Sequence, residues 1–320
     1  MTADSPLVSI LIPAFNAERF LSATLDSVRA QTYDRWEALV VDDGSSDKTP
    51  DLAAEYAAKD SRIRLLRQAN SGVSAARNTA LKAASGEWTA LLDSDDVWLP
   101  TKLESQIRLL REDSRTNLLF SNNWVWDGKQ NGDLRYRKRH KFPEGDVHQG
   151  LIRWCLFTAS TVMIPTKTAI KLGGFDTRLS TAEDWDMWLR VAEEGIWSRG
   201  VWEPQVQFRV WPGSVTKNLP RLATQVVKVL EIAQTRNRVG RFGEDYRRSL
   251  LQSRAKLEMV RAFYDEGPSP KKIRLAALRA FLIFPRRVAY LLCWLAMSVP
   301  GFMGGKVTGD CASKYLKERC

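Results

Sequence analysis

The first 120 residues alternate short apolar runs with amphipathic segments, and this alternation constrains the fold more than any other feature of the chain. Each apolar run has the length of a strand, and each amphipathic segment repeats its apolar residues at helical spacing. Repetition of this kind predicts an α/β fold, a largely parallel sheet covered by helices on both faces. The expected strands are 8–13, 36–41, 62–67, 88–92 and 118–121, and the expected helices are 17–31, one that opens at 49, 74–84 and 100–110.

The pattern changes beyond residue 121. The middle of the chain is less regular, with short strands expected near 161–164 and 205–211 and a helix from about Ala182 to just before Gly195. From about residue 219 onward the pattern is helical and basic. The sequence therefore divides into three regions, 1–121, 122–216 and 217–320.

The last region combines positive charge with a long apolar stretch. Residues 271–287 hold six Lys or Arg and no acid, within a chain of net charge +11, and residues 288–305 hold no charge at all. Pro300 interrupts this stretch, which falls short of the roughly 20 apolar residues that a spanning helix needs. Cationic flanks with Tyr290 and Trp294 favour a helix that lies in the membrane interface. We expect peripheral membrane contact through 271–305; an internally packed helix and a true span are the alternatives.

Composition excludes several functional classes. The four cysteines have no C-x-x-C spacing and there are only two histidines, so neither a disulfide framework nor an imidazole-rich metal site is predicted. Reduced thiols are typical of the cytoplasm, where we expect the protein, on the inner face of the membrane. The positive charge comes without any recognisable nucleic-acid-binding module, so no nucleic-acid partner is expected.

Polar clusters follow three of the expected strands. They are Pro13–Asn16, Asp42–Ser45 and Asp93–Asp96. Ligands bind beyond the carboxyl ends of the strands in open α/β sheets, so these clusters are expected to converge on one crevice. Three carboxylates within four residues repel one another and require a cation, a shared proton or open water. No G-x-G-x-x-G or Walker A sequence is present, which disfavours a dinucleotide fold or a P-loop.

Five motifs in order give the chain a specific resemblance. They are VSILIPAFNAERFL, QTYDRWEALVVDDGSSDKT, NSGVSAARNTAL, GEWTALLDSDD and AEDWDMWLRV. Over about residues 7–215 the chain resembles the family 2 inverting glycosyltransferases of the GT-A fold. The resemblance implies a mostly parallel, Rossmann-like sheet flanked by helices, followed here by a helical basic C-terminal extension. Region 1–121 would bind the nucleotide sugar, and region 122–216 would bind the acceptor and carry a catalytic helix.

The resemblance also implies a role for each residue of the donor site. The donor would be a sugar nucleotide, most often a uridine diphosphate sugar, and Mn²⁺ or Mg²⁺ would bridge its diphosphate. A hard divalent ion takes oxygen ligands and would offset the carboxylate repulsion. The implied contacts are Pro13, Phe15 and Asn16 beside the base, Asp43 accepting from the pyrimidine ring nitrogen, Arg77 near the base and phosphates, Asp93 on the ribose side, Asp95 on the metal, and Asp96 on the donor sugar or behind the metal ligand.

A second centre is the pair Glu183-Asp184. Inverting transfer is a single displacement, so a base must take the proton of the acceptor hydroxyl, and the resemblance places that base at Asp184. Helical geometry puts Asp184 at the border of the apolar face that contains Trp185, whereas Glu183 lies nearly opposite. The alternative is a capping box begun by Ser180 or Thr181. Glu183, Trp185 and Arg209 are expected to support the base or to contact the acceptor.

One position departs from the family pattern. Many relatives have a His where this chain has Trp211, and a Trp side chain offers one N–H and no metal ligand. The last metal or diphosphate contact is therefore assigned to Arg209 or to a group in 212–216.

The predicted function is transfer of a sugar from a nucleotide donor to a hydroxyl of a glycan or lipid-linked glycan, in polysaccharide biosynthesis. Two alternatives stay open. The segment from Leu91 to Val97 also satisfies the D-x-D-x-V pattern of haloacid-dehalogenase-like phosphatases, with Asp93 as nucleophile. A non-catalytic, membrane-associated nucleotide-binding partner is the second.

Overall fold

The computed structural model describes residues 5–126, 135–136, 144–215, 218–237, 240, 242–264 and 270–283. The chain forms two compact units. Unit 1 comprises Met1–Leu151 and Leu156–Ser214, and unit 2 comprises Ile152–Cys155 and Val215–Cys320. Most of the predicted membrane-contact segment 271–305, from residue 284 onward, lies outside the described residues.

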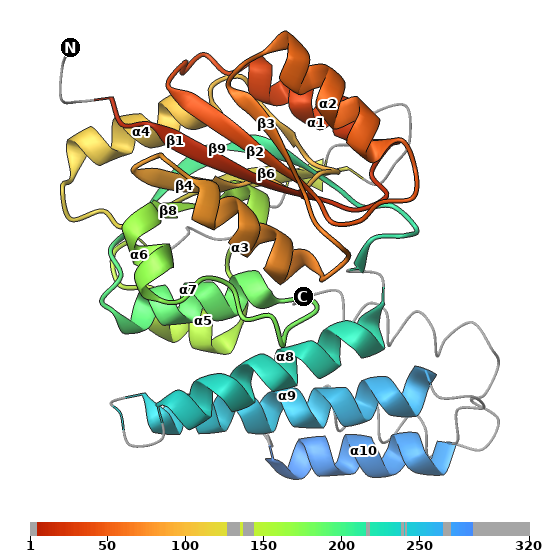
Figure 1. The fold of residues 1–320 in the computed structure, drawn as a ribbon. Coiled ribbons are helices and arrows are strands. Elements are labelled where there is room, and N and C mark those ends of the chain that lie inside the picture. Colours follow the sequence, from red (N-terminus) through yellow and green to blue (C-terminus); the bar gives the residue numbers. More distant parts are fainter. Residues whose placement is uncertain are drawn as a thin grey trace. The chain divides into compact units, whose positions relative to one another are not determined.

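Unit 1 is built on one nine-stranded sheet with the order β3-β2-β1-β4-β8-β6-β9-β5, and β7 pairs with β6 (Figure 1). The first four strands of this order run parallel, as the alternation predicts. The other half is mixed: β8 is antiparallel to both β4 and β6, β5 is antiparallel to β9, and β6 and β9 are parallel. The strands are β1 (Val8–Ala14), β2 (Trp36–Asp42), β3 (Ile63–Arg67), β4 (Trp88–Leu91), β5 (Val97–Trp98), β6 (Leu118–Trp126), β7 (Arg135–Tyr136), β8 (Met163–Pro165) and β9 (Ser198–Arg209).

Helices cover both faces of the sheet, with α1 and α2 on one side and α3 on the other (Figure 1). This is why consecutive residues of β1, such as Ile10, Leu11 and Ile12, are all fully buried although they point alternately to opposite faces. The helices of unit 1 are α1 (Leu21–Arg29), α2 (Thr49–Lys59), α3 (Val73–Ala83), α4 (Lys102–Glu112), α5 (His148–Arg153, which ends in unit 2), α6 (Thr166–Lys171) and α7 (Glu183–Glu193), with a 3-10 turn at Ala159–Thr161.

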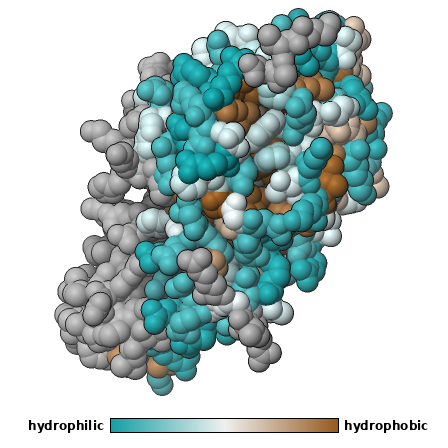
Figure 2. Space-filling model, turned by 90° about the vertical axis from the view of Figure 1, so that its left-hand side faces the viewer, coloured by the Kyte–Doolittle hydropathy of each residue, from teal (hydrophilic) through white to brown (hydrophobic). Residues whose placement is uncertain are grey.

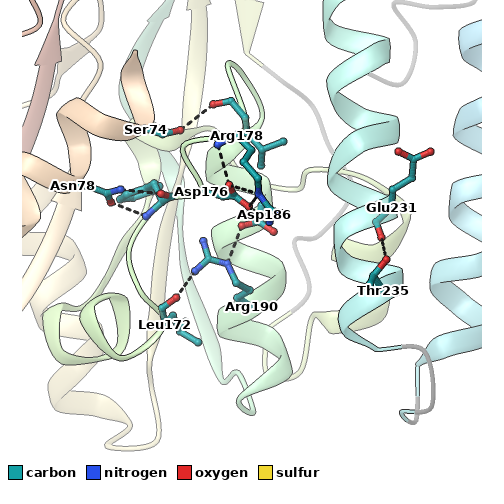
Figure 3. Close-up of polar contacts among 11 residues, drawn as sticks. Ser74, Asn78, Leu172, Asp176, Arg178, Asp186, Arg190, Glu231 and Thr235 are labelled. Atoms are coloured by element: carbon teal, nitrogen blue, oxygen red, sulfur yellow. Dashed lines mark hydrogen bonds and ion pairs between the residues drawn. The ribbon is translucent and has the colours of Figure 1, made fainter. Parts of the chain in front are cut away.

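Unit 2 contains three described helices, α8 (Leu219–Arg236), α9 (Gly243–Tyr264) and α10 (Pro270–Ile283). α9 packs against both α8 and α10, and its contacts bury apolar side chains such as Leu230 of α8 and Ala277 of α10. Within α8, the Thr235 hydroxyl donates to the Glu231 carbonyl oxygen at 2.8 Å (Figure 3). Among the helices that the structure describes, none has the length and apolar character needed to cross a bilayer.

The face of the molecule drawn in Figure 2 is largely hydrophilic, and its hydrophobic residues occur in separate groups between polar ones. Large apolar side chains that stay exposed are few in the described ranges. Two of them are Phe15 in the loop after β1, which is 51% exposed, and Leu275 of α10, which is 49% exposed.

Candidate active site

The polar loops that follow β1, β2 and β4 meet at one edge of the sheet, as predicted. The parallel register pairs Ala14 with Asp42, and the Asp43 amide donates to the Ala14 carbonyl oxygen at 2.9 Å. On the other side of β1, the Leu92 amide donates to the Leu11 carbonyl oxygen at 3.1 Å. The carboxylates after β4 therefore leave the sheet beside the loops of β1 and β2.

The loop after β1 is fixed by Asn16. Its amide donates to the Ser45 hydroxyl at 2.9 Å, and its side-chain Oδ1 accepts from the Ser46 amide at 2.9 Å. Asn16 adopts a left-handed backbone conformation with φ of 47°. This conformation turns the chain so that the neighbouring Phe15 ring stays exposed, while Pro13 is buried within β1. The ring is thus available as a platform, whereas Asn16 builds the loop.

Asp43 is buried, with 4% of its surface exposed, and the loop after β3 surrounds its carboxylate. Oδ1 accepts from the Gln68 side chain at 2.7 Å and from the Ser71 amide at 2.9 Å, and Oδ2 accepts from the Gly72 amide at 2.8 Å. Gly72 has φ of 87°, a conformation that favours glycine. One lone pair of Oδ2 remains for a further donor.

Arg77 joins the two predicted centres. This side chain of α3 is 2% exposed; one guanidinium nitrogen bonds Asp93 at 2.6 Å, and another bonds Glu183 at the start of α7. Burial alone lowers the pKa of Arg77, but the charges of Glu183, Asp93 and Asp184 outweigh it and raise that pKa. Arg77 is therefore a buried cation between the loop after β4 and the start of α7, and its expected contact with the base or phosphates stays a prediction.

The three carboxylates after β4 have different surroundings. Asp93 accepts from Arg77, and Asp95 accepts from the Trp211 indole N–H at 3.0 Å. Asp96 is fully buried: its Oδ2 accepts from the Ser160 hydroxyl at 2.5 Å and its Oδ1 from the Arg209 amide at 2.9 Å. Burial, followed by the charges of Asp95 and Asp93, raises the pKa of Asp96. Both oxygens of Asp96 thus hold β9 and the 3-10 turn, and this arrangement favours its predicted place behind the metal ligand over a contact with the donor sugar.

α7 begins at Glu183, one residue before the predicted base Asp184. Its N-cap residue is Ala182, in a left-handed conformation with φ of 60°, and an alanine side chain cannot cap a helix. The N-cap position is therefore occupied by Ala182, in place of Ser180 or Thr181. Asp184 is half-buried and its Oδ1 accepts from the Trp185 amide at 2.8 Å. Burial, with the neighbouring charge of Glu183, raises the pKa of Asp184 to about 7, although the charge of Arg77 acts in the opposite direction.

The burial of Glu183 differs from the helical-wheel expectation, whereas the burial of Trp185 agrees with it. Glu183, expected opposite the apolar face, is 5% exposed because it pairs with Arg77. Trp185 is 2% exposed and donates to the Leu151 carbonyl oxygen at 2.8 Å, so it supports the helix from within. Of the pair Glu183-Asp184, Asp184 is therefore the more exposed carboxylate.

The segment before α7 is anchored to α3 and to α7 itself (Figure 3). The Ser74 hydroxyl donates to the Leu179 carbonyl oxygen at 3.0 Å, and the Asn78 side chain bonds the Phe175 backbone in both directions at 2.7 and 2.8 Å. In α7, Arg190 bonds Asp186 at 2.8 Å and also reaches the Leu172 carbonyl oxygen at 2.8 Å. These contacts fix where Asp184 stands relative to Arg77.

Asp95 suits a divalent ion only together with a substrate. Within the described ranges, no group of three or more His, Cys, Asp or Glu side chains is arranged to hold a metal. Magnesium-type ions, however, bind nucleotides through one or two carboxylates plus phosphate oxygens. Asp95 lies near a second carboxylate, and burial, with the charge of Asp93, raises its pKa. A nearby cation would relieve that repulsion, so the residues present fit a metal that arrives with a diphosphate.

Sequence reasoning missed several residues that shape the site. Ser160 and Gln68 hold Asp96 and Asp43, and Phe20 and Trp126 flank the Arg209 guanidinium, each with its ring centre 4.6 Å from that group. Phe20 lies in the first of the five motifs, but nothing in that motif points to Arg209, and Ser160, Gln68 and Trp126 lie outside all five motifs. For Ser160 and Gln68, only the acidic character of their partners could have signalled the need for nearby donors.

Comparison with known proteins agrees with this geometry. The family model "Glycosyl transferase family 2" matches residues 9–167. TuaG of Bacillus subtilis (strain 168), named for teichuronic acid biosynthesis, is 32% identical over 219 residues, which cover 68% of this chain and 84% of TuaG. WfgD of Escherichia coli, a UDP-Glc:alpha-D-GlcNAc-diphosphoundecaprenol beta-1,3-glucosyltransferase, is 35% identical over 60% of this chain and 72% of WfgD. The S. aureus TarS 1–349 structure in complex with UDP-GlcNAc shares the fold, with a TM-score of 0.66 and 16% identity over 98% of this chain and 92% of TarS 1–349. The chain belongs to glycosyl transferase family 2 and is a glycosyltransferase.

Proposed function

We propose that the protein transfers a sugar, with inversion, from a uridine diphosphate sugar to a hydroxyl of a glycan or lipid-linked glycan in polysaccharide biosynthesis. The observation that carries this proposal is the Arg77 bridge. Because Arg77 bonds Asp93 and Glu183 at once, the donor loop after β4 and the start of α7 belong to one site. The names of TuaG and WfgD support the class of product, and the names of WfgD and TarS 1–349 support the nucleotide.

Asp184 is the proposed general base. The acceptor oxygen attacks the anomeric carbon as the bond from that carbon to the diphosphate breaks, and the hydroxyl proton passes to the Asp184 carboxylate. A base is most effective when its pKa lies near the working pH, and burial with the Glu183 charge places the pKa of Asp184 at about 7. An ordinary surface aspartate would be ionised but too weak a base to assist this attack.

The donor is proposed to lie along the ends of β1, β2 and β4. The exposed ring of Phe15 offers a stacking surface for the base, and the remaining lone pair of Asp43 accepts from the pyrimidine ring nitrogen. Asp95 would hold Mn²⁺ or Mg²⁺ against the diphosphate, and such an ion supplies charge stabilisation to the leaving group. Arg77 and Glu183 would set the position and charge of Asp93 and Asp184 through the ion pairs of Arg77.

Release of nucleoside diphosphate tests the proposal. Purified protein is offered UDP-Glc, UDP-GlcNAc and GDP-mannose with Mn²⁺ and a mixture of lipid-linked glycan acceptors. We expect release from a UDP-sugar, and a loss of about 10²- to 10⁴-fold in Asp184→Asn with UDP affinity unchanged. Glu194→Gln, an exposed carboxylate just past the far end of α7, serves as the control and keeps full activity. Full turnover in Asp184→Asn would remove Asp184 from the role of base.

The acceptor is proposed to reach the enzyme at a membrane surface through unit 2. Near the junction of α9 and α10, the exposed side chains of Arg261, Tyr264, Lys271, Lys272 and Leu275 combine positive charge with apolar groups. Such a combination is typical of contact with anionic lipid headgroups. Cytoplasmic localisation and peripheral attachment follow from the same proposal.

Sedimentation with lipid vesicles tests this attachment. We expect binding to vesicles that contain phosphatidylglycerol, and at least a tenfold weaker binding in Lys271→Glu/Lys272→Glu, since each lysine near an anionic surface contributes about 1 kcal/mol. The control is Arg247→Glu/Arg248→Glu, an equal change of charge at two residues of α9 that pair with Glu244. Equal losses in both double variants would show that α10 has no special part in the attachment.

A further inference from the structure

The Trp211 side chain holds one of the two carboxylate oxygens of Asp95. Its indole Nε1–H donates to Asp95 Oδ2 at 3.0 Å. The indole ring also packs on Phe20, with ring centres 5.3 Å apart and planes at 58°. Trp211 is half-buried, so it is fixed by its ring on one side and by its N–H on the other.

The turn that carries Trp211 is shaped around its ring. The Trp211 amide donates to the Ser214 hydroxyl at 2.9 Å, and the Ser214 amide donates back to the Trp211 carbonyl oxygen at 2.9 Å. A Cβ atom at Gly213 would lie 2.2 Å from the indole ring, so any larger residue there would force the indole to shift. The turn therefore folds tightly over the indole and restricts its orientation.

The strand before this turn is anchored to the same acidic loop. The Arg209 amide donates to Asp96 Oδ1 at 2.9 Å, and the Arg209 guanidinium lies between the rings of Phe20 and Trp126. β9 pairs with β5, which follows the acidic loop directly. Asp95 and Trp211 are thus held by two segments that are themselves bound together, and their hydrogen bond joins fixed partners.

We propose that Trp211 is a positioning residue for the metal-binding carboxylate. Because the indole N–H occupies Oδ2, Asp95 would hold a divalent ion through Oδ1, and such an ion would supply charge stabilisation to the donor diphosphate. Groups that hydrogen-bond a metal-binding carboxylate typically contribute 10- to 100-fold to metal affinity. Trp211 cannot bind a metal itself, so its effect passes through Asp95. This inference rests on the proposed function, since it assumes that Asp95 binds the ion.

Binding of Mn²⁺ in the presence of UDP tests the inference without any turnover. Free Mn²⁺ is measured by electron paramagnetic resonance while wild type, Trp211→Phe, Asp95→Asn and Trp197→Phe are titrated. Trp211→Phe keeps an aromatic ring near Phe20 and removes the N–H together with part of the larger indole. Trp197→Phe is a matched control, because Trp197 donates to Asp113 Oδ2 at the same distance of 3.0 Å, outside the polar loops of the site.

We expect Trp211→Phe to weaken Mn²⁺ binding at least tenfold, Asp95→Asn to abolish it, and Trp197→Phe to leave it unchanged. Wild-type affinity in Trp211→Phe would overturn the role of Trp211 while the metal site at Asp95 stands. Unchanged binding in Asp95→Asn would overturn both the metal site and the inference. A thermal-unfolding curve for Trp211→Phe that matches wild type shows that any loss of affinity is local.

Discussion

Replacing Glu183 with glutamine tests how strongly the charge of Glu183 raises the pKa of Asp184, the proposed base. The pKa of Asp184 is raised to about 7 by burial first and by the Glu183 charge second, while the Arg77 charge lowers it. Glu183→Gln removes the second of these causes but keeps the size of the side chain and an oxygen that accepts from Arg77. The pKa of Asp184 should therefore fall.

The size of the effect follows from the ionised fraction of Asp184. A base with a pKa of about 7 is about one-tenth ionised at pH 6, so wild type should then run at about a tenth of its alkaline plateau. In Glu183→Gln a larger fraction of Asp184 is ionised at pH 6. The ratio of the rate at pH 6 to the rate at pH 9 should therefore rise by up to about tenfold. Tenfold is the upper limit because the ionised fraction cannot exceed one, and the burial that remains keeps the rise below that limit.

The assay is kcat/KM for nucleotide release between pH 5 and pH 9, with Glu194→Gln as a control outside the site. Glu183→Gln should keep a plateau at high pH, because Glu183 is not the base. Two results would refute the reasoning. An acid limb at the wild-type position would mean that Glu183 has no influence on the pKa of Asp184. Loss of activity at every pH would make Glu183 itself essential to the chemistry.

Three further predictions concern stability in urea. Ala182→Gly should raise the free energy of unfolding by up to about 1 kcal/mol, because glycine adopts the left-handed conformation without strain; a loss would contradict this. Asp184 has a raised folded-state pKa, so its ionisation destabilises the fold progressively as pH rises from its ordinary 3.8 through about 7. Asp184→Asn should remove that effect and raise the free energy of unfolding by about 2 to 4 kcal/mol at pH 8 but by little at pH 4. An equal increase at both pH values would contradict the raised pKa of Asp184. Asp96→Ala should lower the free energy of unfolding by about 2 to 4 kcal/mol, because it leaves the Ser160 hydroxyl and the Arg209 amide without their acceptor. Wild-type stability in this variant would contradict the structural role of Asp96.

Features that depend on residues close to one another in the sequence could be predicted. Strand ends follow from runs of apolar residues, so the meeting of the loops at Asp43 and Asp95 could be foreseen. The role of Arg77 could not, because its partners Asp93 and Glu183 lie 16 and 106 positions away, and a charged residue in a helix is normally exposed. The short β8 was placed only approximately, since three residues carry too little periodicity to fix its ends.

The same long-range contact explains why the helical wheel misplaced Glu183. Periodicity assigns a charged residue to the solvent because an unpaired carboxylate is costly to bury. Glu183 avoids most of that cost by pairing with Arg77, which also pairs with Asp93, so three charges are buried or half-buried together. This network contains one more carboxylate than cation before Asp184 is counted. Burial is the largest cause of the raised pKa of Asp184, and ionising Asp184 in addition brings negative charge to a site that is already negative. Together these two causes raise its pKa to about 7, the range in which the proposed general base is most effective.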